Sequence, residues 1–347
     1  MRDYIMRIAI FGPINGKNYF GGVATFDENL AIAFKKICST NDVYVYSKQA
    51  EEPFSDAYGV HFLPVNFLTA FCIKNFDVAI FSLDYAAYLP IIKARKKAYF
   101  LHGFFSLVAY SPLKTILAIL YQKIFLKYAD YIIGNSFFTC FINREVYNIV
   151  SDGHVKLGVS YPYLKQLSAC DVKKEPYTVL FAGRLVKAKN IDKIVQAMKC
   201  LQNLTSRTYL LRIVGDGELK EYLAEYVHKN NLNVEFCGTV DQHEIVKFYK
   251  ISQIFISLNP TEPFGITFCE ALLAGCQIVC PNTGGQVEFL KQYPDSVEML
   301  PDLEPETIAK AIMKLDCTLK PTKIDIKNFT YEETGKNILR IMGETIE

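Results

Sequence analysis

The sequence contains no tryptophan, only five histidines and no surplus of charge of either sign. Its 347 residues include 38 basic and 36 acidic side chains, which gives a formal charge of +2. Proteins whose main task is to bind nucleic acid usually carry a strong basic excess, so we expect no nucleic-acid partner. The ten cysteines form no CxxC pair and have apolar neighbours. This predicts reduced, buried thiols rather than a metal site or a disulfide framework.

Long apolar runs are also absent. No stretch approaches about 18 uncharged apolar residues, so the sequence predicts no transmembrane helix. The first residues, MRDYIMRIAIFGP, lack the apolar core and the small-residue cleavage site of a secretory signal. We therefore expect a cytoplasmic protein.

Short apolar runs alternate along the chain with longer segments of helical period. Runs such as RIAIF (7–11) and TVLFAGR (178–184) are apolar throughout, which is typical of parallel strands covered on both faces. A single core rarely grows past about 250–300 residues, so two domains are expected. The sequence predicts an α/β protein with two Rossmann-like, doubly wound parallel sheets facing a central cleft. The irregular stretch near its middle places the first domain at 1–161, a linker at 162–175 and the second domain at 176–327.

The segment NPTEPFGITFCEALLAG (259–275) has the most informative pattern. Pro263 and Gly265 interrupt a helix, so Glu262 should lie on a loop that leads into a helix starting near Ile266. The amides of Gly265, Ile266 and Thr267 would then form an anion site at the start of that helix. Glu270, one turn further on, would accept hydrogen bonds from sugar hydroxyls, although a Glu there also favours the helix dipole.

Other glycine-rich and basic turns follow predicted strands. FAGRLVKAKN (181–190) places Arg184 and Lys189 five residues apart, a combination that suits a diphosphate but is also common in solvated basic turns. TGGQ (283–286) is a glycine turn that opens a helix. The glycines of VGDG (214–217) are expected to serve tight packing.

Taken in order, these segments resemble the C-terminal domain of GT-B retaining glycosyltransferases of family 4 (glycosyl transferases group 1). The N-terminal half resembles the family less closely, through FGGV (20–23), LHG (101–103) and YIIGNS (131–136). FTYEETGKNILRIM (329–342) resembles the family's terminal helix, so segment 328–347 is expected to join the first domain. The first loop departs from the dinucleotide fingerprint GxGxxG, which argues against a nicotinamide cofactor.

The resemblance implies a role for each matching residue. Arg184 and Lys189 would bind the donor diphosphate and stabilise the leaving nucleotide, with Glu262 beside the transferred sugar and His102 lining the sugar pocket as the other catalytic positions. Glu270 would hold the ribose. The remaining expected substrate-binding residues are Gly21, Gly22, Val240, Asp241, Phe264, Gly265, Ile266 and Thr267.

The implied reaction moves a sugar from a nucleotide-diphosphate donor to a hydroxyl of a glycan or lipid-linked acceptor, in polysaccharide or glycolipid synthesis. Cations and amides would meet the charge on the leaving group, so no metal or other cofactor is expected. Both a covalent intermediate on Glu262 and front-face attack stay open, the family favouring the second. Two alternatives remain: a sugar-nucleotide epimerase of the same fold, and a non-catalytic binding or scaffold member.

A membrane surface is the last expected partner. Segment 104–128 is unusually apolar, which favours a core helix for most of its side chains and leaves an interfacial helix as the alternative. Lys114, Lys123 and Lys127, together with basic residues of IIKARKKAYF (91–100), would then face anionic lipid. Residues 1–170 hold 17 basic and 12 acidic residues, whereas the rest of the chain holds 21 and 24. The near-zero total charge therefore results from a basic first half and a mildly acidic second half.

Overall fold

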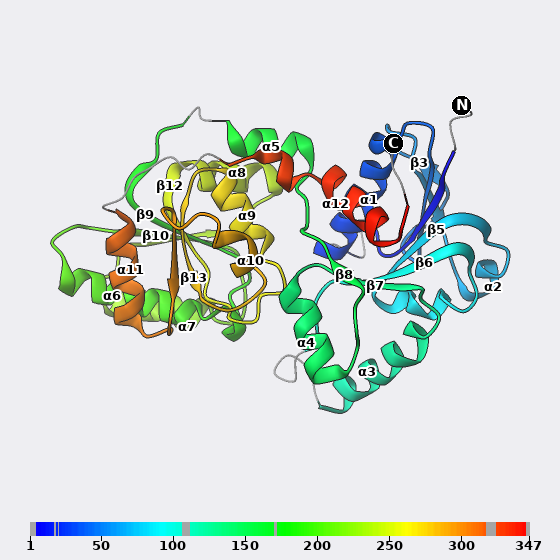
Figure 1. Cartoon of the computed structure of the whole chain (residues 1–347). Helices are drawn as coiled ribbons and strands as arrows, with labels where there is room; N and C mark the ends of the chain where they lie inside the picture. The colour runs from blue at the N-terminus through cyan, green and yellow to red at the C-terminus, as the bar shows by residue number, and fades with distance from the viewer. Residues whose placement is uncertain are drawn as a thin grey trace. The chain divides into compact units, whose positions relative to one another are not determined.

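The chain forms two α/β units, each built on a mostly parallel sheet (Figure 1). The structure is a computed structural model that describes residues 5–16, 19, 21–105, 112–169, 172–316 and 324–344. The first unit comprises Met1–Ser160 and Lys327–Glu347, and the second comprises Tyr161–Ile326. The predicted fold class, two doubly wound parallel-sheet domains, is confirmed.

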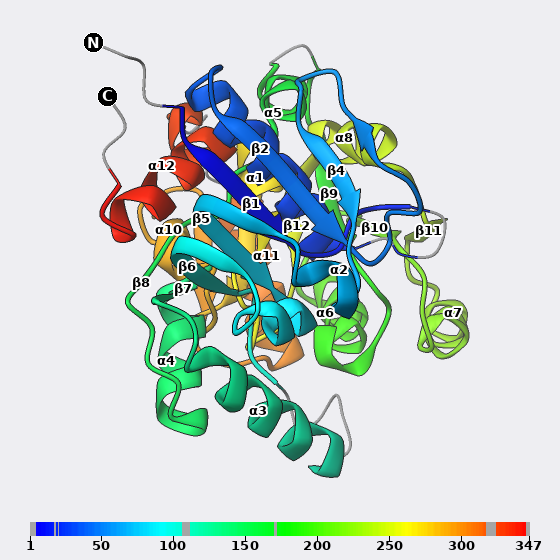
Figure 2. The ribbon, with the colours of Figure 1, turned by 90° about the vertical axis from the view of Figure 1, so that its right-hand side faces the viewer.

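The first unit has an eight-stranded sheet in the order β3-β4-β2-β1-β5-β6-β7-β8, and the succession from β4 to β6 can be followed in Figure 2. Neighbouring strands are parallel except for β3, which is antiparallel to β4. The strands are β1 (Arg7–Phe11), β2 (Asp42–Ser47), β3 (Phe54–Ser55), β4 (His61–Pro64), β5 (Lys74–Ser82), β6 (Lys93–Leu101), β7 (Tyr131–Gly134) and β8 (Gly153–His154).

Two apolar clusters cover the two faces of this sheet. On one face, α1 (Gly22–Ile37) and α12 (Tyr331–Ile341) pack on β1, β2 and β5. On the other face lie α2 (Phe67–Ala70), η1 (Leu83–Tyr88), α3 (Pro112–Leu126) and α4 (Phe137–Tyr147). Parallel strands need cover on both faces, which explains why they are apolar throughout.

The C-terminal helix α12 lies beside α1, although 293 residues lie between the end of α1 and the start of α12 (Figure 1). Gly335 permits this approach, because a Cβ atom there would lie 3.2 Å from the ring of Phe34. Thr334 also donates a hydrogen bond to the carbonyl of Lys156 at 2.8 Å. Apolar packing and this hydrogen bond together fix the end of the chain on the first unit.

The second unit has a six-stranded parallel sheet in the order β11-β10-β9-β12-β13-β14. Its strands are β9 (Glu175–Ala182), β10 (Leu210–Val214), β11 (Val234–Gly238), β12 (Ser252–Ile256), β13 (Gln277–Pro281) and β14 (Val297–Leu300). Its helices are α5 (Tyr161–Ser168), α6 (Ile191–Leu204), α7 (Lys220–Lys229), α8 (Gln242–Ile251), α9 (Ile266–Leu273), α10 (Val287–Leu290) and α11 (Pro305–Asp316), with the short turn η2 (Lys187–Lys189). The turn η3 (Ile326–Phe329) lies where the chain passes from the second unit back to the first.

The segment expected to be a linker, 162–175, contains most of helix α5. Leu164 and Leu167 are fully buried where α5 packs against α8 and α9. Pro162 lies in the first turn, where its missing N–H costs no intrahelical hydrogen bond. The expectation of an unstructured linker is therefore wrong for residues 162–168, because an amphipathic helix there completes the cover of the second sheet.

Candidate functional site

The loops that carry the predicted donor motifs follow β9, β12 and β13. These strands run parallel and pair with one another, so the loops meet at the same edge of the second sheet. Asn190, at the start of α6, joins two of them by donating from its side-chain amide to the carbonyl of Leu258 at 2.8 Å. The fold therefore brings residues 183–190 and 257–266 together within the second unit.

Glu262 lies on the loop before α9, as predicted, and its carboxylate is held on both sides. Lys189 Nζ lies 2.6 Å from Glu262 Oε2, and both side chains are mostly buried. Asn259 donates to the same oxygen at 3.0 Å. Lys189 is thus committed to an ion pair in the ligand-free protein, which sequence spacing alone did not reveal.

Arg184 differs from Lys189. Its side chain is exposed, and we find no acceptor for it among the described residues. A guanidinium in this position is available to grip an anion with two parallel N–H groups. The two cations predicted to act together therefore start from different states: Arg184 is unengaged and Lys189 is paired.

The TGGQ turn supports the loop that carries Glu262. Gly285 donates its amide to the carbonyl of Glu262 at 2.8 Å, and the Thr283 hydroxyl donates to the carbonyl of Pro260 at 3.0 Å. Gln286, which is fully buried, donates to the carbonyl of Thr283 at 2.5 Å. These contacts fix the backbone on both sides of Glu262.

Helix α9 begins at Ile266, the predicted position. Gly265 precedes it with φ of +87°, in the left-handed region that favours glycine. The amides of Ile266 and Thr267 have no acceptor among the described residues, and both side chains are half-buried. Free amides at a helix start attract anions, so the expected anion site has the required backbone geometry.

We expect Gly265→Ala to destabilise the protein by about 2–4 kcal/mol. The new Cβ would need a positive φ and would lie 2.7 Å from the Phe268 ring and 3.0 Å from Gln286 Cβ. Both neighbours are fully buried and have no room to move. Urea unfolding measures the effect, with Gly22→Ala as control because a Cβ at Gly22 meets nothing within 4 Å. Equal stability of Gly265→Ala and the parent would contradict this account.

Two tyrosines lie close to the carboxyl group of Glu270. The Tyr249 hydroxyl on α8 donates to Glu270 Oε2 at 2.9 Å. Burial raises the pKa of Glu270 to about 7, and the Tyr249 hydrogen bond partly opposes this shift. Tyr163, on α5, lies close enough for the Glu270 charge to raise its own pKa, after the larger effect of burial. Glu270 is therefore poised between its two charge states near neutral pH.

Two predicted substrate contacts have other roles in the structure. Asp241 caps α8, since its carboxylate accepts from the amides of His243 and Glu244, both at 2.8 Å. The Phe264 ring is 3% exposed and packs on Phe289 with centroids 5.3 Å apart, so only its backbone is left for a ligand. Val240 is half-buried beside the cap and shows no specific contact. The expected roles of Val240, Asp241 and Phe264 in substrate binding stay predictions.

The glycines of VGDG serve packing, as expected. A Cβ at Gly215 would lie 2.0 Å from the carbonyl of Gly183, and one at Gly217 would lie 2.6 Å from that of Leu185. The close approach of these two loops fixes the backbone on either side of Arg184. The turn thus positions Arg184 without taking part in binding.

In the first unit, His102 follows β6 and is linked to a buried carboxyl group. Its Nε2 lies 2.9 Å from the Ser82 hydroxyl, which donates to Asp27 Oδ1 at 2.8 Å. In that arrangement the hydroxyl oxygen accepts from Nε2 and Nδ1 is left without a proton. Burial lowers the pKa of His102 to about 3 and raises that of Asp27 well above its usual value. His102 is therefore a neutral, oriented imidazole.

Sequence reasoning missed Ser82 and Asp27. Asp27 lies among Ala24, Phe26, Leu30 and Ala31 on the inner face of α1, where a charged residue is rare. That isolated acid on an apolar helix face was the available signal. Ser82 ends an apolar strand and gave no signal, because a serine there is common.

The glycine pair of the first loop is only partly available to a ligand. The Gly21 amide already donates to the Asn15 side chain at 3.2 Å. Asn15 is in turn held by Glu28, whose carboxylate accepts from its amide at 2.6 Å and from its side chain at 3.0 Å. Space is open around Gly22. The Gly21 amide is therefore already hydrogen-bonded in the ligand-free protein, and the expected role of Gly21 in substrate binding stays a prediction.

The described ranges contain no group of three or more His, Cys, Asp or Glu side chains arranged to hold a metal ion. None of the helices in these ranges combines the length and the apolar character needed to cross a bilayer.

Comparison with solved structures agrees with this architecture and places it in the GT-B class. A glycosyltransferase from Rickettsia africae superposes with a TM-score of 0.68 at 19% identity, covering 97% of both chains. HepE of Anabaena, solved in complex with UDP, gives a TM-score of 0.68 at 16% identity, covering 98% of this chain and 100% of that one. At such low identity these likenesses establish the fold alone.

Sequence comparison finds a family similarity within the second unit. Residues 167–316 match the family model for Glycosyl transferases group 1. A glycosyltransferase of Methanocaldococcus jannaschii is 30% identical over 170 residues, which cover 48% of this chain and 43% of that protein. The chain spans about half the length of the curated relatives it matches.

Proposed function

We propose that this protein is a retaining glycosyltransferase of family 4 that transfers a sugar from a nucleoside-diphosphate sugar to a hydroxyl of a glycan or lipid-linked acceptor. One observation carries the proposal. The exposed Arg184, the Lys189–Glu262 ion pair and the free amides at the start of α9 gather at one edge of the second sheet. Positive groups beside a carboxylate suit a diphosphate joined to a sugar.

In this proposal the sugar–oxygen bond to the diphosphate breaks while negative charge accumulates on the leaving group. Arg184 and the amides of Ile266 and Thr267 meet that charge directly. Lys189 is shared between the leaving group and Glu262, which it contacts at 2.6 Å. The ribose hydroxyls donate to Glu270. Since these groups belong to the protein, we propose a reaction that needs no metal ion.

We favour front-face attack over a covalent intermediate. Glu262 Oε2 already accepts from Lys189 and Asn259, which lowers its readiness to form a bond to carbon. The acceptor oxygen forms the new bond on the face that the diphosphate leaves, and its proton passes to the departing diphosphate oxygen. Glu262 then orients the sugar and stabilises positive charge near its anomeric carbon.

His102 is proposed to bind a hydroxyl of a substrate sugar. Its pKa of about 3 keeps it uncharged, so it contributes hydrogen bonding rather than charge. The link through Ser82 to Asp27 fixes which ring nitrogen carries the proton. This arrangement supports a binding role more than proton transfer.

A panel of nucleotide sugars tests the proposal, beginning with UDP-sugars because HepE was solved with UDP. We expect one donor to release its nucleoside diphosphate at a rate that an acceptor glycan increases and that EDTA leaves unchanged. Proton NMR of the product should show the donor's anomeric configuration.

The two alternatives give different results in the same panel. An epimerase would convert the donor into its epimer without any acceptor. It would release no free nucleoside diphosphate. A scaffold would show no heat of binding with any nucleoside diphosphate in calorimetry. Either result would contradict the transferase proposal and support the corresponding alternative.

A further inference from the structure

Helix α3 exposes apolar side chains on its outward side, where a helix that faces water usually carries polar ones. The outward side chains are 51–67% exposed, and they are Leu113, Ile116, Leu117, Leu120 and Ile124. The inward positions include Thr115 and Gln122, which are 1% and 7% exposed. The sequence favoured a core helix here, and that expectation is wrong for the five outward residues. Segment 106–111, also part of that expectation, lies outside the described residues.

The exposed residues form one continuous stripe. Successive members at 113, 117, 120 and 124 are spaced by four, three and four, so they lie along one side of the helix. Tyr128, just beyond the helix, is 50% exposed and extends the stripe by a further turn. Scattered exposed apolar residues are ordinary, but a stripe of this length marks a contact surface.

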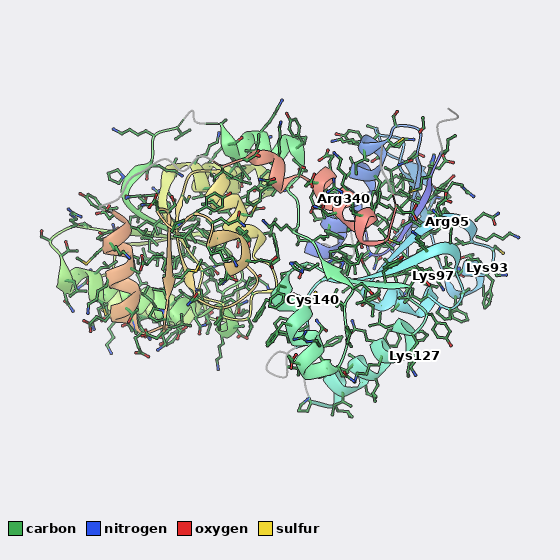
Figure 3. The ribbon with its side chains drawn as sticks, in the orientation of Figure 1. Lys93, Arg95, Lys97, Lys127, Cys140 and Arg340 are labelled. Atoms are coloured by element: carbon green, nitrogen blue, oxygen red, sulfur yellow. The ribbon has the colours of Figure 1, made fainter. Side chains whose placement is uncertain are left out.

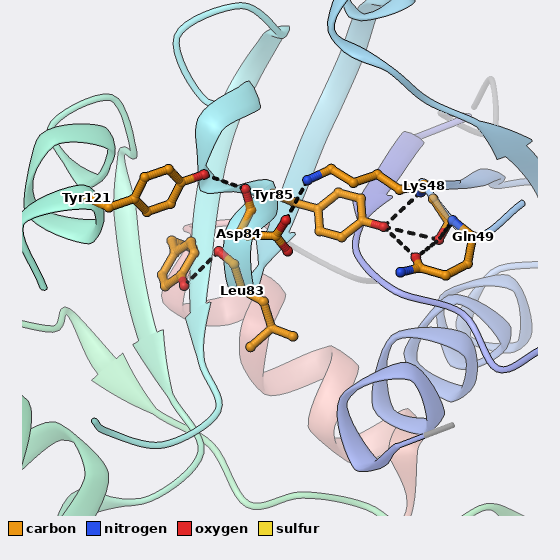
Figure 4. A network of polar contacts seen from close by, with 8 residues as sticks. Lys48, Gln49, Leu83, Asp84, Tyr85 and Tyr121 are labelled. Atoms are coloured by element: carbon orange, nitrogen blue, oxygen red, sulfur yellow. Dashed lines mark hydrogen bonds and ion pairs between the residues drawn. The ribbon is translucent and has the colours of Figure 1, made fainter. Parts of the chain in front are cut away.

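Contacts on the inner side hold α3 in place without the stripe. The Tyr121 hydroxyl donates to the carbonyl of Asp84 at 2.6 Å, and Gln122 donates to the Tyr99 hydroxyl at 3.3 Å. Tyr99 in turn donates to the carbonyl of Leu83 at 3.1 Å. Figure 4 shows the Tyr121 hydroxyl bonded to Asp84, whose carboxylate is paired with Lys48. Packing within the unit therefore gives no reason for the outward Leu and Ile.

The charged side chains of α3 and of the two residues after it are all positive. Lys114 and Lys123 are on α3 and Lys127 follows it, and no acidic residue occurs between 112 and 128. Lys127 extends from the end of α3 in Figure 3. The nearby carboxylates are engaged: Asp84 pairs with Lys48, and Asp130 accepts from the amide of Lys97 at 2.7 Å.

The basic residues of β6 do not belong to this surface, contrary to the sequence expectation. Arg95 and Lys96 form ion pairs with Glu344 at 2.9 and 2.8 Å. Lys97 donates its ammonium to the carbonyl of Leu89 at 3.0 Å. Lys93 alone among these residues is exposed without a described partner. The positive charge of the surface therefore comes from the lysines next to the stripe.

We propose that α3 docks this protein on an anionic lipid bilayer, lying in the plane of the interface with its apolar stripe inward. At 15 residues the helix is about 22 Å long, too short to cross a bilayer. Apolar side chains flanked by lysines are what an interfacial helix needs. A second copy is disfavoured as the occupant, because two stripes face to face would bring six lysines together without an acid.

Sedimentation with lipid vesicles tests the docking. We expect the protein to bind vesicles of phosphatidylcholine with 30% phosphatidylglycerol at low salt. We expect no binding to vesicles that contain only phosphatidylcholine. The variant L117S/L120S/I124S should bind at least about tenfold more weakly. Lys123→Glu with Lys127→Glu should weaken binding about 30-fold or more.

Leu68→Ser is the matched control, since Leu68 is 80% exposed on another helix, α2, of the same unit. It should bind like the parent, and all variants should unfold at the same temperature within about 2 °C because the replaced side chains are exposed. The measurement needs neither donor nor acceptor, so its outcome is independent of the proposed transfer reaction.

Three results would overturn the docking. They are absence of the parent from anionic vesicles, undiminished binding of the stripe variant, and an equal loss in Leu68→Ser. A parent dimer in light scattering that the stripe variant converts to monomer would also overturn it, and would assign the stripe to a second copy.

Discussion

Arg184→Ala should lower kcat/KM for sugar transfer by a factor of about 100–1000 while leaving the fold intact, because the leaving diphosphate loses a preorganised cation. The side chain is exposed and has no acceptor among the described residues, so its removal breaks no structural contact. The thermal midpoint should stay within about 2 °C of the parent. Steady-state kinetics with the best donor of the panel measures the effect.

Lys187→Ala is the matched control for Arg184. Lys187 is a second exposed cation on the same loop, in the turn η2, and has no proposed ligand. We expect its loss to change the rate by less than about threefold, as for other surface charges. Arg184→Lys should recover only part of the rate, because an ammonium cannot offer two parallel N–H groups. Equal rates in Arg184→Ala and Lys187→Ala would show that the loop acts only through general charge.

The second large effect concerns Glu270. Glu270→Ala should weaken donor binding by a factor of about 10–150, the value of charge-assisted hydrogen bonds to the ribose. Calorimetry with an intact nucleotide sugar is the appropriate measurement, since its bridging diphosphate does not titrate near neutral pH. Glu244→Ala, which removes an exposed glutamate from α8, should bind the donor normally.

The same carboxyl group gives donor binding a pH dependence. Its pKa of about 7 means that it becomes protonated as the pH falls through neutrality. The ionised form accepts two hydroxyl hydrogen bonds and the neutral form fewer, so affinity should fall below pH 7 and level off above about pH 8.

Two variants make this pH dependence specific to Glu270. Tyr249→Phe removes the hydrogen bond that stabilises the ionised carboxylate and should move the transition to higher pH. Glu270→Gln should abolish the transition. A parent affinity that is constant from pH 5.5 to 8.5 would exclude Glu270 from the ribose site.

Much of the donor half of the site followed from local sequence. Pro263 and Gly265 determined where the loop ends and α9 begins, because proline and a left-handed glycine both restrict the backbone locally. The strand ends next to Arg184 and Glu262 were also predictable from apolar runs. Contacts that are distant in sequence were not, and the clearest example is the ion pair between Lys189 and Glu262, 73 residues apart.

In the first unit, too, local sequence identified positions but not the contacts that are distant in sequence. His102 was identified through the resemblance of LHG (101–103) to the family's motif, but its link through Ser82 to Asp27 joins three elements that only the sheet order brings together. The glycine pair looked available in sequence, whereas Asn15 occupies one of its amides. In both cases local sequence identified the position, and a partner from elsewhere in the chain determined its chemical state.

By itself, the sequence determined the alternation of buried strands and helices, the two parallel-sheet units, the loops that carry Arg184 and Glu262, and the helix that carries Glu270. It did so because these features depend on hydrophobic periodicity and on local backbone restrictions. Tertiary structure alone decided which charged groups are paired and which face of α3 is exposed. A helix that is apolar on most sides does not encode its own orientation, and the contacts of Tyr121 and Gln122 with η1 and β6 turn the leucines and isoleucines of α3 outward.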